Sequence, residues 1–274
     1  MNMDNKIQGY HPKDEDRINQ VIDADLFVPD QYYESSNDLE IPDLKLDMQA
    51  KYVERPFLLF GEQKRTLNMQ GSGVLHFYCD DYRYGSSLYE HPEKILKHNP
   101  ASIVEPNYSL YQDTPIAFGM QAVYKKRFIA RAMQERGIRC FVDLNVAAKF
   151  YKLNLIGIPP GWSAFCTRGY SDRLNYLAFE LEIAKSVAGD NPLTFVVYGG
   201  GEKVRQFCKE FGLIYITPTV TIKKRAKALE AIKETVAFFG QELKIDRQLP
   251  TKDDVFLRQV EDFNKELKKE NNIQ

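Results

Sequence analysis

The 274-residue chain lacks several features that would place it in a special class of protein. It has no run of 18 or more apolar residues, so we expect no transmembrane helix and no membrane partner. Residues 1–16 are polar, and we expect no secretory signal there. The hydrophobic content is 43%, and glycine and proline are near their average frequencies, which excludes disordered and collagen-like classes.

Signatures of well-known catalytic sites are also missing. The four cysteines form no CxxC pair, and the four histidines have none of the spacings typical of zinc enzymes. No GxSxG or Walker sequence is present. Cys79, Cys140 and Cys166 lie in or at the end of apolar runs, which is typical of buried, inert thiols. Cys166 could be a nucleophile only beside a histidine that the sequence does not place. Unpaired cysteines favour a reducing, cytoplasmic location.

Charge is balanced over the whole chain but not along it. Residues 1–60 carry six basic and thirteen acidic side chains, whereas the remaining residues carry 31 basic and 25 acidic ones. An acidic leader on a mildly basic body is compatible with a protein partner that docks on the leader, and with nucleic acid or nucleotides bound by the body. It is equally compatible with an acidic segment that is merely solvated. The small basic excess argues against a dedicated binder of long duplex DNA.

Short, continuous apolar runs recur from residue 56 onward, which is typical of strands buried on both faces. We predict strands at 56–60, 74–79, 102–105, 139–144, 163–167, 193–198 and 213–217. Helical patterns separate many of them, at 116–136, 171–187, 202–211 and 225–239. This alternation predicts an α/β fold with a mainly parallel sheet and crossover helices, either doubly wound or an incomplete β/α barrel. We expect an acidic N-terminal arm (1–55), an α/β domain (56–245) and a charged helical tail (246–274).

Polar residues follow the predicted strands at their carboxyl ends, where parallel α/β folds place their ligand sites. The candidate catalytic residues are Asp80, Asp81 and Asp143. The candidate ligand-binding residues are Arg83, Glu105, Asn107, Ser109, Arg127, Asn145, Arg168, Tyr198, Gly199 and Gly200. The carboxylates could hold a magnesium ion, and the arginines could pair with these acids or with a phosphate. The alternative is a rim of salt bridges and strand-end caps without a ligand.

Three further patterns each have two interpretations. Gly199-Gly200-Gly201 is either a plain tight turn or a phosphate cradle at a helix start. The basic clusters Lys125-Lys126-Arg127 with Arg131, and Lys223-Lys224-Arg225 with Lys227, are either solvated helix faces or contacts to a phosphate backbone. The favoured interpretations are the tight turn and the solvated faces. Tyrosines near basic residues suit base stacking or an ordinary core: Tyr82, Tyr84, Tyr108, Tyr124 and Tyr170.

Five blocks together carry a family resemblance: 77–83, 105–111, 124–127, 157–161 and 196–199. They resemble a family of bacterial and phage proteins that is catalogued only as a domain of unknown function. The most specific blocks are Asp80-Asp81-Tyr82-Arg83 and Pro106-Asn107-Tyr108-Ser109-Leu110-Tyr111. Asn107 stands where the family pattern has Asp, and the block around Asp143 departs from its Pro-Thr-x-x-Trp pattern. The resemblance implies a phage or mobile-element protein and assigns no activity.

The sequence therefore leaves three hypotheses. The first is a phage- or plasmid-type protein that acts on nucleic acid or nucleotides, for instance in DNA replication, through the polar rim. The second is a non-catalytic module that binds a ligand or a partner, with the acidic arm as the docking segment. The third is a structural or assembly protein of a mobile element. Whether the chain is an enzyme is left open.

Overall fold

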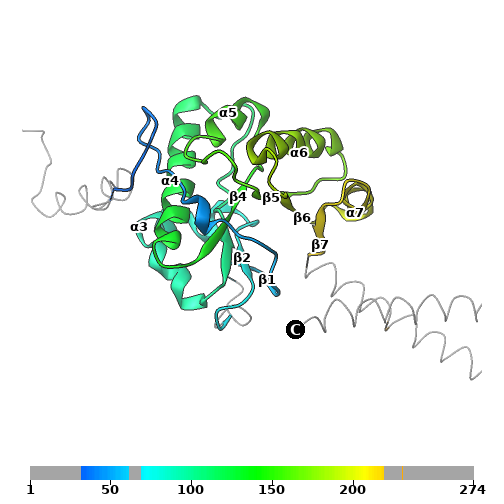
Figure 1. Ribbon diagram of the computed structural model, residues 1–274, viewed down its shortest axis with the longest axis horizontal. Coiled ribbons are helices and arrows are strands. Elements are labelled where there is room, and N and C mark those ends of the chain that lie inside the picture. Colours follow the sequence, from blue (N-terminus) through cyan, green and yellow to red (C-terminus); the bar gives the residue numbers. More distant parts are fainter. Residues whose placement is uncertain (1–31, 62–68, 219–229, 231–274) are drawn as a thin grey trace, which may run out of the picture. The chain divides into compact units, whose positions relative to one another are not determined.

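The computed structural model describes residues 32–61, 69–218 and 230 of the chain, and these contain seven short strands (Figure 1). The strands are β1 (Phe57–Leu59), β2 (Val74–His76), β3 (Ser102–Val104), β4 (Arg139–Asp143), β5 (Ala164–Arg168), β6 (Thr194–Tyr198) and β7 (Ile214–Ile216). They form one sheet in the order β1-β2-β3-β4-β5-β6-β7. The pairs β1–β2, β2–β3, β3–β4, β4–β5 and β6–β7 are parallel.

This topology confirms the predicted α/β fold. The strand order runs without the reversal that defines a doubly wound sheet, so it is the strand order of a β/α barrel. Six strands fall within the predicted ranges, and β5 extends one residue beyond its predicted range, to Arg168. The reason is visible in β2 and β3, where every side chain is buried, as a parallel sheet with helices on its faces requires.

Helices connect the strands as the alternation predicted. The helices are α3 (Gly85–Glu90), α4 (Ile116–Gln134), α5 (Tyr151–Asn154), α6 (Leu174–Ala188) and α7 (Gly201–Glu210). Short 3-10 segments are η1 (Leu46–Met48), η2 (Asp81–Arg83), η3 (Pro92–His98) and η4 (Ala148–Phe150). The predicted helices at 116–136, 171–187 and 202–211 correspond to α4, α6 and α7. Among the described residues, no helix combines the length and the apolar character that a membrane crossing requires.

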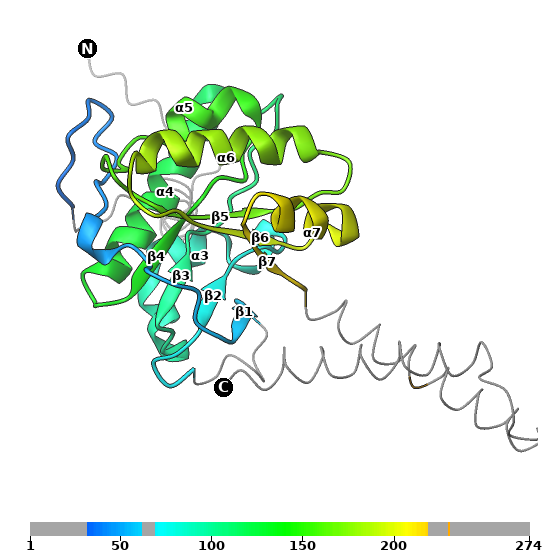
Figure 2. The same cartoon turned by 45° about the vertical axis from the view of Figure 1, so that its right-hand side comes forward.

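The long helix α4 lies beside β4, as Figures 1 and 2 both show, and it is buried over most of its last three turns. Its end is marked by Gly137, which has a positive φ of 81°. There the amide of Ile138 donates to the carbonyl of Met133 (3.0 Å), which closes the helix in a Schellman motif. The predicted stop at this glycine is therefore confirmed, and the chain turns directly into β4.

The chain divides into two compact units, which we describe separately. The first comprises residues up to 167 together with 179–195, and it contains β1 to β4, most of β5 and helices α3 to α5. One of its apolar clusters packs the loop after β3 against the loop after β4, with Leu110, Val123, Val146 and Phe150 as members. The second unit comprises 168–178 and residues from 196 onward, and it contains α7 and β7.

The described part of the acidic N-terminal segment is packed into the first unit. Ile41, Leu44 and Ala50 are buried, and Gln49 forms an isolated parallel bridge with Cys140 at the start of β4. This segment therefore contributes to the core. Residues 1–31, the basic cluster at 223–227, the predicted helix at 225–239 except residue 230, and the predicted tail lie outside the described residues.

Candidate functional site at the carboxyl ends of the strands

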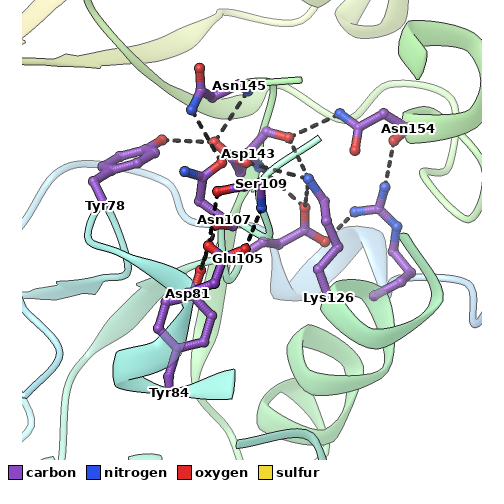
Figure 3. A network of polar contacts seen from close by, with 11 residues as sticks. Tyr78, Asp81, Tyr84, Glu105, Asn107, Ser109, Lys126, Asp143, Asn145 and Asn154 are labelled. Carbon is purple, nitrogen blue, oxygen red and sulfur yellow. Dashed lines mark hydrogen bonds and ion pairs between the residues drawn. The ribbon is translucent and has the colours of Figure 1, made fainter. Parts of the chain in front are cut away.

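A network of buried charged side chains lies at the carboxyl ends of β3 and β4 (Figure 3). Asp143 is the last residue of β4, and Glu105 follows β3 directly. The preceding strand residues are apolar and hold both acids in place, with their side chains fully buried. Two cations from α4, Lys126 and Arg127, are equally inaccessible. Four ionisable groups therefore share one water-excluded region of the first unit.

Each acid in this network is paired with a cation. Arg127 forms a very short ion pair with Oε1 of Glu105. Lys126 Nζ lies 3.7 Å from Oε2 of Glu105 and 3.4 Å from Oδ2 of Asp143, and it donates to the carbonyl of Asp143 (2.8 Å). Two carboxylates thus face two cations, which gives a buried cluster without net charge. Such pairing offsets the desolvation of the charges, and the loss of one member is costly.

Three asparagines add hydrogen bonds to this cluster. The side-chain amide of Asn154 donates to the main-chain carbonyl of Asp143 (3.0 Å). The main-chain carbonyl of Asn154 accepts from Arg127 Nη2 (2.6 Å). In the amide orientation that satisfies its neighbours, Asn107 donates to Oδ2 of Asp143 (3.2 Å). The backbone amide of Asn145 donates to Oδ1 of the same acid (3.2 Å). Asp143 therefore ties the loop after β3 to the loop after β4.

Tyr78 lies on the other side of Asp143 and donates its hydroxyl to Oδ1 (2.9 Å). Burial raises the pKa of this phenol well above its usual value, and the neighbouring Asp143 adds to the effect. Burial also raises the pKa of Asp143, although Lys126 and the Tyr78 hydroxyl lower it. Cys166, the nucleophile considered from the sequence, is fully buried near Tyr78, and burial raises its pKa well above the usual range. It is a protonated, inert thiol at neutral pH.

A third buried acid, Glu180, lies on helix α6. Glu180 projects from α6 and is almost fully buried. Burial raises its pKa well above the usual value, while hydrogen bonding to Thr167 and Tyr151 lowers it. No salt bridge to Glu180 is found within the described residues. Burial therefore disfavours the ionised form of this carboxyl.

Nearer the surface, Asp81 fastens η2 to the loop after β3. Its Oδ2 accepts from the backbone amide of Ser109 (2.8 Å), and its Oδ1 accepts from the Ser109 hydroxyl (3.0 Å). Tyr84 donates to the carbonyl of Asn107 (2.5 Å), which adds a second link between the same segments. β2 has ended at His76, so Asp81 does not alternate with Asp80 across a sheet; it begins a 3-10 turn.

The structure thus brings most of the sequence-predicted residues of the first unit together, in two layers. The inner layer is Glu105, Arg127 and Asp143. The outer layer, which we call the strand-end rim, consists of Asp80, Asp81, Arg83, Ser109 and Asn145, all of them exposed or partly exposed. Asn107 is buried between the two layers.

The interpretation of the basic cluster on α4 needs correction. Lys126, Arg127 and Arg131 were expected on a solvated helix face, with phosphate contact as the alternative. All three are buried, because α4 turns them toward carboxylates and main-chain carbonyls of the first unit. Each guanidinium nitrogen of Arg127 donates to Glu105 or to a main-chain carbonyl, and the residue is fully buried, so an external phosphate does not reach it.

The buried carboxylates are poorly suited to magnesium. Glu105 and Asp143 already face an ammonium and a guanidinium, which a metal ion would have to displace. Within the described ranges, no group of three or more His, Cys, Asp or Glu side chains has the arrangement of a metal site. The residues therefore do not fit the magnesium ion considered from the sequence.

The remaining predicted site residues belong to the second unit. Arg168 is exposed and lies over the ring of Tyr170, 5.5 Å from its centroid. Gly199 and Gly200 both have positive φ, and Gly200 is the N-cap of α7. A Cβ atom on Gly200 would collide with Val204 and with the backbone of Gly169. Backbone conformation and close packing thus explain these glycines, as the favoured tight-turn interpretation requires.

Sequence reasoning missed Lys126, Asn154 and Glu180. A signal existed for Lys126, because it lies three residues after Val123 and four before Ala130, on the buried stripe of α4. A lysine on such a stripe indicates a buried carboxylate partner. Glu180 occupies the corresponding position on α6, between the buried Leu177 and Ala184. Asn154 carries no comparable pattern.

Comparison with known proteins places the chain among phage proteins. It is 26% identical over 210 residues to the "Gene 1 protein" of Mycobacterium phage D29, an alignment that covers 74% of this chain and 75% of that protein. It is 30% identical over 109 residues to the "Gene 1 protein" of Mycobacterium phage L5, covering 39% of this chain and 46% of that protein. No solved structure matches. Because the family model described as "Domain of unknown function (DUF4417)" matches residues 33–237, this phage-type chain belongs to that family.

Proposed function

We propose that this protein binds nucleic acid or nucleotides through the strand-end rim. The observation that supports the proposal is the position of the rim, since ligand sites of parallel α/β proteins lie at the carboxyl ends of the strands. The segment after β2 meets the segment after β3 through Asp81 and Ser109. The segment after β4 meets the segment after β3 through Asn145 and Asn107. A buried, charge-neutral network lies directly beneath them and fixes their backbone.

The chemistry of the rim suits a phosphate. Arg83 is an exposed residue of the rim, and a guanidinium is the usual planar partner of phosphate oxygens. The partly exposed Asn145 brings a side-chain amide to the same rim. Asp81 accepts hydrogen bonds from the amide and the hydroxyl of Ser109, which fix the orientation of its carboxylate.

Within this proposal, Asp143 is a positioning residue and not a catalytic one. It is fully buried, and its two oxygens are taken up by Tyr78, Lys126 and neighbouring amides. It holds the loops that carry Asn107 and Asn145. A binding role therefore accounts for the geometry better than the magnesium-dependent enzyme considered from the sequence.

The test is fluorescence anisotropy with a labelled single-stranded 12-mer, together with a thermal-shift screen against nucleotides. Arg83→Ala is expected to weaken binding at least tenfold. The matched control is Arg136→Ala, an exposed arginine just beyond the opposite end of α4, which is expected to bind like the unaltered protein. Binding that survives Arg83→Ala, or an unaltered protein that binds no nucleic acid or nucleotide, would contradict the proposal. The partner-binding and assembly hypotheses would then take its place.

A further inference from the structure

Large apolar side chains are exposed immediately beside the strand-end rim. Tyr111, Ile116 and Phe118 lie on the segment that follows Ser109 and enters α4, and 66%, 53% and 63% of their surfaces are accessible. Tyr111 is two residues from Ser109, so about 7 Å of chain separates the two Cα atoms. Single exposed apolar residues are ordinary, but three within eight residues at the functional end of the sheet require an explanation.

The exposure does not come from a loosely packed loop. The amide of Tyr111 donates to the Thr114 hydroxyl (3.0 Å), and the amide of Thr114 donates back to the Tyr111 carbonyl (3.1 Å). Leu110 is buried, and its carbonyl accepts from the amide of Ala147 (3.1 Å). Gly119, directly after Phe118, lies so close to the ring of Phe150 that a Cβ atom there would overlap it. The exposed rings are therefore carried by a well-anchored backbone.

A positive charge lies close to the same segment. Lys149 is exposed, and its Nζ is 5.0 Å from the centroid of the Phe150 ring that packs on Gly119. Exposed aromatic rings beside a basic side chain are the combination that proteins use to bind single strands, because the rings stack on bases and the cation contacts the backbone phosphates. A protein-docking patch would not need the lysine, and apolar contact with a second copy would bury it.

We propose that Tyr111 and Phe118 form a base-stacking surface for single-stranded nucleic acid, with Lys149 contacting its phosphates. The inference rests on the proposed function and specifies its ligand: a single strand with bases, in preference to a mononucleotide. Two of the five tyrosines considered from the sequence, Tyr84 and Tyr108, instead pack edge to face against each other, with ring centroids 5.5 Å apart.

The experiment compares a 12-residue oligothymidylate with an abasic 12-mer of the same charge. Tyr111→Ala and Phe118→Ala are each expected to lower the affinity for oligothymidylate about 5-fold or more. Affinity for the abasic strand should stay within twofold of that of the unaltered protein. Lys149→Gln is expected to lower the affinity for both oligonucleotides alike. The slope of the logarithm of the affinity against the logarithm of the salt concentration should fall by an amount equivalent to about one phosphate contact.

Tyr52→Ala is the matched control. Tyr52 is 64% exposed, close to the value of Tyr111, but it follows a segment that contacts the amino ends of β4 and β6. The stacking inference fails if Tyr52→Ala loses as much affinity as Tyr111→Ala, or if the unaltered protein binds both strands equally. It also fails if Phe118→Ala changes only the oligomeric state in size-exclusion chromatography. If the unaltered protein binds neither strand nor any nucleotide, the proposed function itself is wrong.

Discussion

Replacement of Lys126 by methionine removes one cation from the buried network while keeping most of the side-chain volume. In the folded protein, Lys126 Nζ contacts the carbonyl of Asp143 (2.8 Å), Oδ2 of the same residue (3.4 Å) and Oε2 of Glu105 (3.7 Å). After the substitution, two buried carboxylates face only the guanidinium of Arg127. We expect Lys126→Met to lower the free energy of unfolding by about 3–5 kcal/mol, the usual cost of leaving a buried charge without its partner.

A second substitution separates lost charge pairing from lost packing. Asp143→Asn in the Lys126→Met background removes the uncompensated charge, so the double variant should be less unstable than the sum of the single effects. A coupling of about 1–3 kcal/mol is expected for two groups in direct contact. Urea denaturation followed by circular dichroism measures all four proteins. Lys185→Met is the control, because this exposed lysine pairs with Glu182 on the surface and its loss should cost less than about 1 kcal/mol.

The dependence on pH provides an independent check. Burial raises the pKa of Asp143 and Lys126 lowers it, so removal of Lys126 must raise the pKa further. An acid whose pKa is higher in the folded state binds its proton on folding, and its destabilising effect therefore appears as the pH rises. The loss in free energy of unfolding caused by Lys126→Met should be smaller at pH 5 than at pH 8. A deficit below about 1 kcal/mol, or one that grows on acidification, would refute the charge-pairing argument.

Two further substitutions test other parts of the molecule. Relative to the unaltered protein, Glu180→Gln should be more stabilising at pH 8 than at pH 5, because burial raises the pKa of Glu180. Each pKa unit corresponds to about 1.4 kcal/mol. Equal changes in the free energy of unfolding at both pH values, measured by urea denaturation, would contradict this. Gly169→Ala should destabilise by about 1–3 kcal/mol, because its Cβ would lie 2.5 Å from the carbonyl oxygen of Gly199 and 2.7 Å from Val204. Gly201→Ala meets no atom within 4 Å, but its φ of 78° is unfavourable for alanine, so thermal unfolding of the two variants compares the cost of a steric clash with the cost of backbone strain.

The strands of this fold could be predicted because each is encoded locally. Val74 and Leu75, or Ile103 and Val104, form continuous apolar runs that suit only a strand covered on both faces. The end of α4 could be predicted for the same reason, since Gly137 supplies the positive φ that closes the helix. Strand order follows only from the pairings, which periodicity does not encode.

The pairing of charges could not be predicted in this way. Lys126 contacts Asp143, which lies 17 residues further along the chain, and Asp81 contacts Ser109, 28 residues away. A local pattern shows which residues are polar, but not which of them meet when the strands align. Arg127 was therefore assigned to a solvated helix face, although the fold turns it toward Glu105.

The buried network and the strand-end rim depend on each other through very few bonds. Asp143 accepts from the amide of Asn145 in one loop and, in the amide orientation that satisfies its neighbours, from the side chain of Asn107 in another. A change at Asp143 should therefore weaken ligand binding without any contact between this carboxylate and the ligand. Weaker binding by Asp143→Asn under conditions in which circular dichroism shows the variant to be fully folded would indicate such positioning, and unchanged affinity would contradict it. The affinities for the abasic 12-mer and for oligothymidylate should then both fall, because the two loops carry the rim that is proposed to contact the phosphates of either oligonucleotide.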